Sequence, residues 1–178
     1  YAEAKELLLR AVGEYPHNLG EGKLESGQEN NLYYLLGLVQ EKLGEAKDAF
    51  ESLTRACCGE SEPVGMMYYN DQPPEMIYYQ GLAYRMLGEE EQAVRRFQKL
   101  VDYGREHIRD DVKIDYFAVS LPDLLIFEEN LNERNRKHCL FMMSLGLKGL
   151  GRIDEAEKCA EELLAMDNAH QEIRVHDL

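Results

Sequence analysis

One spacing of small and apolar residues occurs three times in this chain and constrains its fold more than any other feature. In each copy a small residue is followed seven positions later by a glycine and five positions after that by an alanine. Apolar residues at three- and four-residue intervals before and after the glycine indicate two helices. The glycine can adopt the left-handed backbone conformation that commonly ends a helix, and the small residues let the two helices approach closely. The sequence therefore predicts three helical hairpins, at Gly37–Gly44–Ala49, Gly81–Gly88–Ala93 and Ser144–Gly151–Ala156.

The spacing resembles the tetratricopeptide repeat family, whose consensus has small residues, glycine and alanine at these positions. The resemblance implies an all-α fold, a right-handed superhelical array of antiparallel helix pairs of the TPR-like α-solenoid type. Two glutamines, Gln40 and Gln80, depart from the consensus because the family prefers apolar core residues there. The glycines are 44 and 63 residues apart instead of the 34 of tandem repeats, which predicts insertions of ten and twenty-nine residues.

We expect a single repeat domain over residues 1–178. A half repeat at 1–16, carrying Ala4, Leu8, Ala11 and Pro16, matches the second helix of a repeat and indicates that the chain is a fragment of a larger protein. Full repeats are predicted at 30–58, 74–108 and 133–168, with a helical insertion at 109–131. Residues 116–127 are rich in large apolar side chains and are expected to pack on the repeats. Residues 168–178 are expected to begin a further helix.

Two tyrosine-containing segments, 68–74 and 116–125, carry a second and weaker resemblance. They are similar to the C-terminal repeat tail of large bacterial proteins, whose N-terminal domain is uncharacterised and has a suggested link to carbohydrates. This resemblance implies that the chain is the repeat domain of such a protein.

The charge of the chain bounds its partners. The formal net charge is −14, from 34 acidic and 20 basic side chains, so nucleic acids and anionic membranes are not expected partners. No segment approaches the ~20 apolar residues that span a bilayer, and no signal peptide is recognisable, which favours a cytoplasmic location. Four cysteines without a CxxC spacing predict free, mostly buried thiols in a reducing compartment: Cys57, Cys58, Cys139 and Cys159.

In the family that the chain resembles, the first helices of successive repeats line a concave groove. Carried over residue by residue, the resemblance implies an apolar stripe with polar edges that binds a protein or peptide. The predicted groove residues are Tyr34, Leu38, Glu41, Lys42, Tyr78, Leu82, Arg85, Met86, His138, Phe141, Leu145 and Lys148. The clamp with which some members grip a carboxylate is not expected, because Tyr34, Leu38 and Tyr79 occupy its positions. Whether the groove is open or covered by the chain's own insertion stays undecided at this point.

Catalytic and metal-binding patterns are weak. The chain has no HExxH, P-loop, GxGxxG or GxSxG motif, and His138 and Cys139 point about 100° apart on a helix. We therefore predict neither catalysis nor a cofactor nor a metal site.

The leading interpretation is a protein-interaction scaffold that binds a peptide or a segment of its parent protein. The alternative is an accessory repeat domain of a carbohydrate-active bacterial enzyme that contributes aromatic residues to a substrate cleft. Self-association through open repeat ends is a third possibility.

Overall fold

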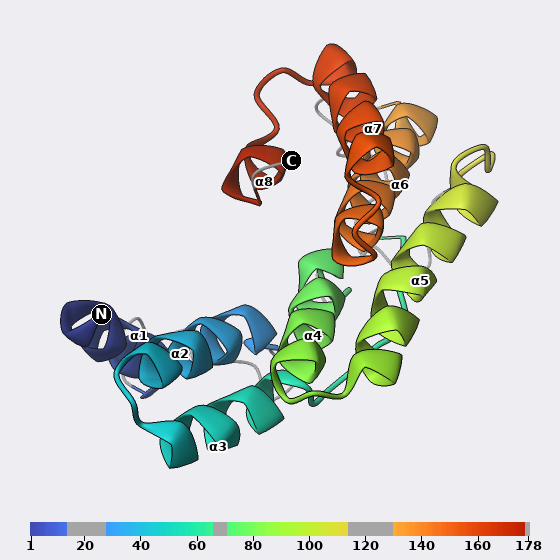
Figure 1. Ribbon diagram of the computed structural model, residues 1–178. Helices are drawn as coiled ribbons and strands as arrows, with labels where there is room; N and C mark the ends of the chain where they lie inside the picture. The colour runs from blue at the N-terminus through green and yellow to red at the C-terminus, as the bar shows by residue number, and fades with distance from the viewer. Residues whose placement is uncertain (14–27, 66–70, 114–129, 177–178) are drawn as a thin grey trace.

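A computed structural model describes residues 1–13, 28–65, 71–113 and 130–176. These residues form eight helices and no strand (Figure 1). The helices are α1 (Ala2–Gly13), α2 (Asn30–Lys42), α3 (Ala46–Ala56), α4 (Pro74–Met86), α5 (Glu90–His107), α6 (Leu131–Gly149), α7 (Ile153–Met166) and α8 (Gln171–Val175). The predicted all-α, tetratricopeptide-like repeat fold is therefore confirmed.

The helices pack as neighbouring pairs along an arc. The hairpins α2–α3, α4–α5 and α6–α7 each form an extensive interface, while α1 packs on α2 and α6 packs on α5. The three turns share one geometry, because Gly44, Gly88 and Gly151 have φ of +78°, +81° and +74°. Residues that carry a Cβ atom rarely adopt this left-handed backbone conformation, so the turn favours glycine.

Close packing within the pairs depends on small residues. Ala49, Ala93 and Ala156 were predicted to lie buried between the paired helices, and all three are buried. In the main core the ring of Phe97 occupies the space that Gly81 of α4 and Gly149 of α6 leave free, and a Cβ at either glycine would collide with it. Glycine inside α6 lowers helix propensity by up to ~1 kcal/mol. The space taken by Phe97 explains why glycine is nevertheless used there.

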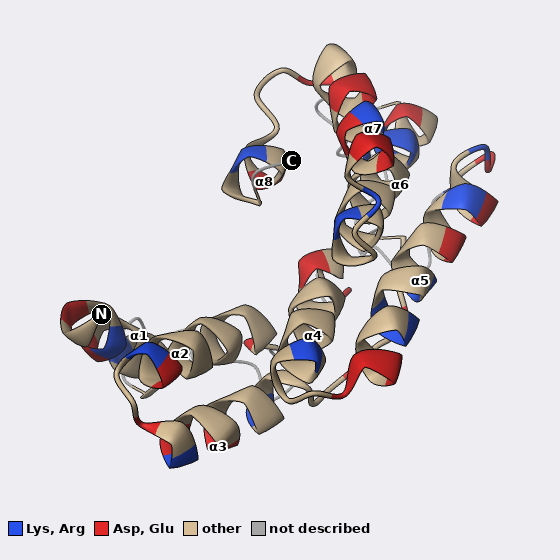
Figure 2. Ribbon diagram, viewed as in Figure 1, with Lys and Arg blue, Asp and Glu red and all other residues tan. Residues whose placement is uncertain are grey.

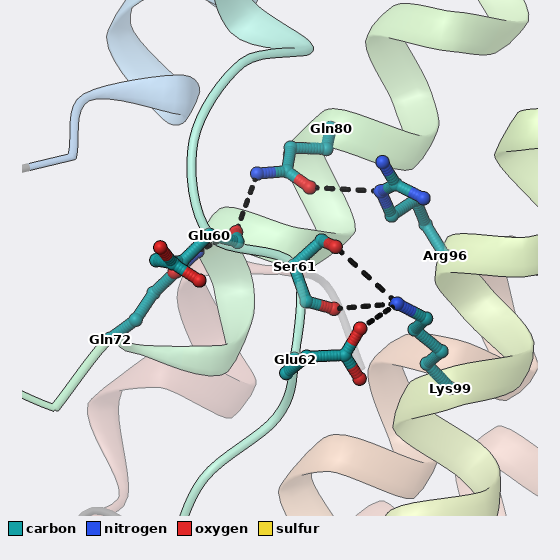
Figure 3. A network of polar contacts seen from close by, with 7 residues as sticks. All are labelled: Glu60, Ser61, Glu62, Gln72, Gln80, Arg96 and Lys99. Carbon is teal, nitrogen blue, oxygen red and sulfur yellow. Dashed lines mark hydrogen bonds and ion pairs between the residues drawn. The ribbon is translucent and has the colours of Figure 1, made fainter.

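The segment between α3 and α4, meaning here residues 58–64, is held by a buried glutamine (Figure 3). Gln80 is fully buried. Its amide nitrogen donates to the carbonyl oxygens of Cys58 at 3.1 Å and Glu60 at 2.8 Å, and its amide oxygen accepts from Arg96 Nε at 3.0 Å. A buried amide is tolerated when its donors and acceptor are paired. The departure of Gln80 from the consensus thus serves to hold this segment.

Two later helices hold the same segment at further points. Lys99 of α5 contacts Ser61 at 3.4 Å and pairs with Glu62 (Figure 3). His138 Nε2 of α6 lies 2.8 Å from the carbonyl oxygen of Val64. Residues 58–64 are therefore packed onto α4, α5 and α6.

Other sequence predictions have mixed outcomes. All four cysteines are free, as predicted, but Cys139 is buried, Cys57 and Cys159 are half-buried and Cys58 is exposed. The expectation of mostly buried thiols is therefore wrong. No helix in the described part of the chain is long and apolar enough to cross a membrane. Residues 116–127, expected to pack on the repeats, lie outside the described residues, so that prediction stays open.

Candidate partner-binding face

The short helix α8 lies on the inner side of the arc, next to α4 and α6 (Figure 1). We call the side of α4 and α6 that contacts α8, together with its continuation onto α2, the inner face. It is formed by the first helix of each hairpin, which is the side where the sequence predicted a groove.

Aromatic contacts join α8 to the inner face. The ring of His176, directly after α8, has its centroid 6.0 Å from that of Tyr78, 5.6 Å from Tyr79 and 5.9 Å from Phe141. The ring of His170, directly before α8, lies 5.4 Å from Phe141. Offset and edge-on ring pairs at these separations are attractive. Both ends of α8 are thus held by aromatic side chains of α4 and α6.

An apolar anchor and a hydrogen bond complete the docking of α8. Ile173 is fully buried and belongs to the main core cluster. Lys148 Nζ of α6 donates a hydrogen bond to the carbonyl oxygen of His176. A cation at the C-terminal end of a helix is favourable because it satisfies a free carbonyl and complements the helix dipole.

The inner face continues from α4 onto α2 beyond the reach of α8. The rings of Tyr34 on α2 and Tyr79 on α4 lie 5.4 Å apart. Leu38 and Leu82 follow Tyr34 and Tyr78 by four residues, which puts them on the same helix faces. Tyr34, Leu38 and Leu82 are half-buried. This part of the face therefore offers apolar side chains that are still accessible.

The twelve predicted groove residues fall into three groups by exposure. Tyr78, Phe141 and Leu145 are buried, at 7%, 4% and 0% exposed. Tyr34, Leu38, Leu82, Met86, His138 and Lys148 are half-buried, and Glu41, Lys42 and Arg85 are exposed. The structure brings Tyr34, Tyr78 and Phe141 together through Tyr79 and His176. Binding of a partner by any of the twelve remains a prediction.

Some predicted polar edges have partners within the chain. Arg85 forms a bidentate pair with Glu90 at 2.8–3.2 Å, and its guanidinium lies 5.0 Å from the centre of the Phe97 ring. His138 faces Val64. Arg85 is thus held at the turn between α4 and α5, and His138 holds the segment between α3 and α4.

Four residues of the inner face were not among the predicted groove residues: Tyr79, His170, Ile173 and His176. The spacing of Ile173 and His176, three residues apart, is a signal of a helical face. Nothing in so short a segment indicates that this face turns back onto α4 and α6.

The inner face disfavours ionised groups. Burial, assisted by the nearby charge of Glu172 on α8, raises the pKa of Glu75 to about 7, although a hydrogen bond to its own backbone N–H opposes the shift. Burial also raises the pKa of Tyr78 to about 12 and lowers the pKa of His138. Desolvation penalises the charged form of each group. The face is therefore suited to apolar and aromatic side chains.

The described residues contain no cluster of three His, Cys, Asp or Glu side chains that could hold a metal ion.

A comparison with protein families gives one match. The tetratricopeptide repeat model matches residues 75–103, which run from the first turn of α4 into α5 and include the turn at Gly88. The resemblance to the tetratricopeptide repeat family is confirmed by this match, while the weaker resemblance to bacterial repeat tails stays a prediction. A comparison with solved structures gave no significant match.

Proposed function

From the tetratricopeptide repeat that this chain carries at residues 75–103, we propose that it is a protein-interaction scaffold that binds a peptide, or a segment of its parent protein, on the inner face. Such repeats generally mediate protein–protein interaction and are typically not catalytic. One observation supports the proposal above all others: the inner face already holds a helical segment, α8, through Ile173 and His176.

The accessible part of the inner face on α2 and α4 is the proposed peptide site. Tyr34, Leu38 and Leu82 would be its apolar anchors, because partly exposed aromatic and aliphatic side chains gain most from being covered. Figure 2 shows that α2 and α4 carry few charged residues, while charges gather on α5 and α7. The net charge of −14 attracts basic peptides over longer distances. A peptide with apolar anchors and basic flanks fits both features.

A peptide selection tests this site. Peptides from a random display library would be selected on the purified protein and measured by calorimetry on two variants. Leu38→Glu puts a charge on the inner face. Phe50→Glu puts the same charge on α3, where Phe50 is 62% exposed, and serves as the matched control.

We expect the selected peptides to lose at least about tenfold in affinity with Leu38→Glu, because a carboxylate must then be desolvated against apolar groups. They should bind Phe50→Glu as they bind the unmodified protein. Equal binding to both variants would exclude the α2–α4 part of the inner face as the site.

The alternative role, an accessory domain of a carbohydrate-active enzyme, gains no support from the described residues. Sugar stacking requires an accessible ring face. Tyr78 and Phe141 are buried and do not offer one.

A further inference from the structure

The helix α8 depends on the inner face for its structure. It has five residues, far below the ~12–15 at which an isolated helix becomes even marginally stable. Close backbone approach joins the helices within each hairpin, but α8 makes no extensive interface of this kind with any other helix. Among the described residues, its contacts with the repeats come from Ile173, the rings of His170 and His176, and the hydrogen bond from Lys148. Loss of these few contacts would release it.

Two features make the docking of α8 weaker than its apolar contacts alone would allow. The Nε2 atom of His176 is buried without a hydrogen-bond partner among the described residues, and an unpaired buried polar atom costs free energy. The charge of Glu172 on α8 contributes to the raised pKa of Glu75 on α4, so the two carboxyl groups repel each other when both are ionised. A helix that lacked both features would bind the same surface better.

We propose that the α4–α6 part of the inner face is a helix-binding site that α8 occupies within its own chain and from which a partner helix displaces it. This rests on the proposed function and adds both the class of partner and its regulation. The partner helix carries a branched apolar residue at the position of Ile173 and an aromatic ring three residues later. It has a neutral or basic residue in place of Glu172, and its last carbonyl groups face Lys148.

A direct test uses two fluorescent peptides on the full chain. The first has the sequence of residues 168–176. The second has the same sequence with Glu172→Lys and His176→Phe, which removes the repulsion and the unpaired nitrogen. Each is titrated into the unmodified protein and into Ile173→Asp, in which a buried carboxylate is expected to release α8. A peptide that itself carries Ile173→Asp is the negative control.

We expect the second peptide to bind more tightly than the first. We also expect both to bind Ile173→Asp at least about tenfold more tightly than the unmodified protein, because α8 no longer competes. In the Ile173→Asp background, Lys148→Ala should weaken binding, while Lys158→Ala on α7 should not. Equal affinity for the unmodified protein and Ile173→Asp, or binding to neither, would overturn the proposal.

Hydrogen exchange keeps the test decisive if Ile173→Asp fails to fold. Saturating the unmodified protein with the second peptide should speed exchange of the α8 amides while α4 and α6 remain protected, whereas unchanged α8 exchange would overturn displacement.

The display-selected peptides separate the two proposals. If they bind in a Leu38-dependent way while the α8 peptides do not bind, the scaffold function stands and only the helix site is lost. If neither kind of peptide binds, both proposals are lost.

Discussion

Replacing Gly146 with alanine should destabilise the protein even though alanine is the better helix former. A Cβ on Gly146 would lie 2.5 Å from the backbone carbonyl oxygen of Phe97 and 2.7 Å from Val101 Cγ2. The carbonyl belongs to the backbone of α5 and cannot rotate away, so α5 and α6 must move apart along an extensive interface. Overpacking of this kind costs ~1–3 kcal/mol, and a shift of backbone puts the cost near the upper end.

The gain in helix propensity offsets about 1 kcal/mol of that cost, which leaves a net loss of about 2 kcal/mol. For a chain of this size the loss corresponds to a fall of roughly 4–8 °C in Tm, measurable by far-ultraviolet circular dichroism. Gly13→Ala is the matched control, because nothing lies within 4 Å of a Cβ at Gly13. Its Tm should stay the same or rise. A Tm for Gly146→Ala equal to that of Gly13→Ala would refute the packing argument.

Three further outcomes are expected. The pKa of Glu75 is raised in the folded protein from 4.5 to about 7, so the contribution of its carboxyl to stability is complete below pH 4.5 and is lost as the pH rises to about 7. Glu75→Gln should therefore raise Tm at pH 8 and leave it nearly unchanged at pH 4. Equal effects at both pH values would contradict this. Ala93 is fully buried, so Ala93→Leu should lower stability by ~1–3 kcal/mol in a urea titration, and an unchanged midpoint would show that the repeat register is wrong. Iodoacetamide should modify the exposed Cys58 of the native protein well before Cys139, because Cys139 is buried and its burial raises the pKa of its thiol to about 12. Mass spectrometry that showed the reverse order of modification would reject these placements.

The hairpins could be predicted because their signals are local. A glycine that must adopt positive φ and an alanine that must fit between two helices lie five residues apart in each repeat. Within the repeat predicted at 30–58, for example, helices are observed at Asn30–Lys42 and Ala46–Ala56. Each of these requirements comes from the backbone of a single hairpin. The hairpins can therefore be recognised from one amino-acid sequence.

Features that depend on distant residues could not be predicted in this way. Gly149 looks unfavourable in the sequence of α6, and its reason is the ring of Phe97 on another hairpin. The consensus places His138 at the groove edge, but it contains no counterpart of the segment ending near Val64 that His138 contacts. The contact of His176 with Tyr78 joins residues far apart in the sequence, and no periodicity encodes it.

The attachment of the segment between α3 and α4 sets an order of events during synthesis. Its partners appear in sequence: Gln80 comes 20 residues after Glu60, Lys99 comes 37 residues after Glu62, and His138 comes 74 residues after Val64. Chains are synthesised at about 5–20 residues per second, so Val64 waits on the order of 4–15 s for its partner. The first hairpin can form as it leaves the ribosome, whereas the segment that follows it acquires its last contact only when the third hairpin emerges. A ribosome that pauses within that interval would leave this segment open to proteases and chaperones.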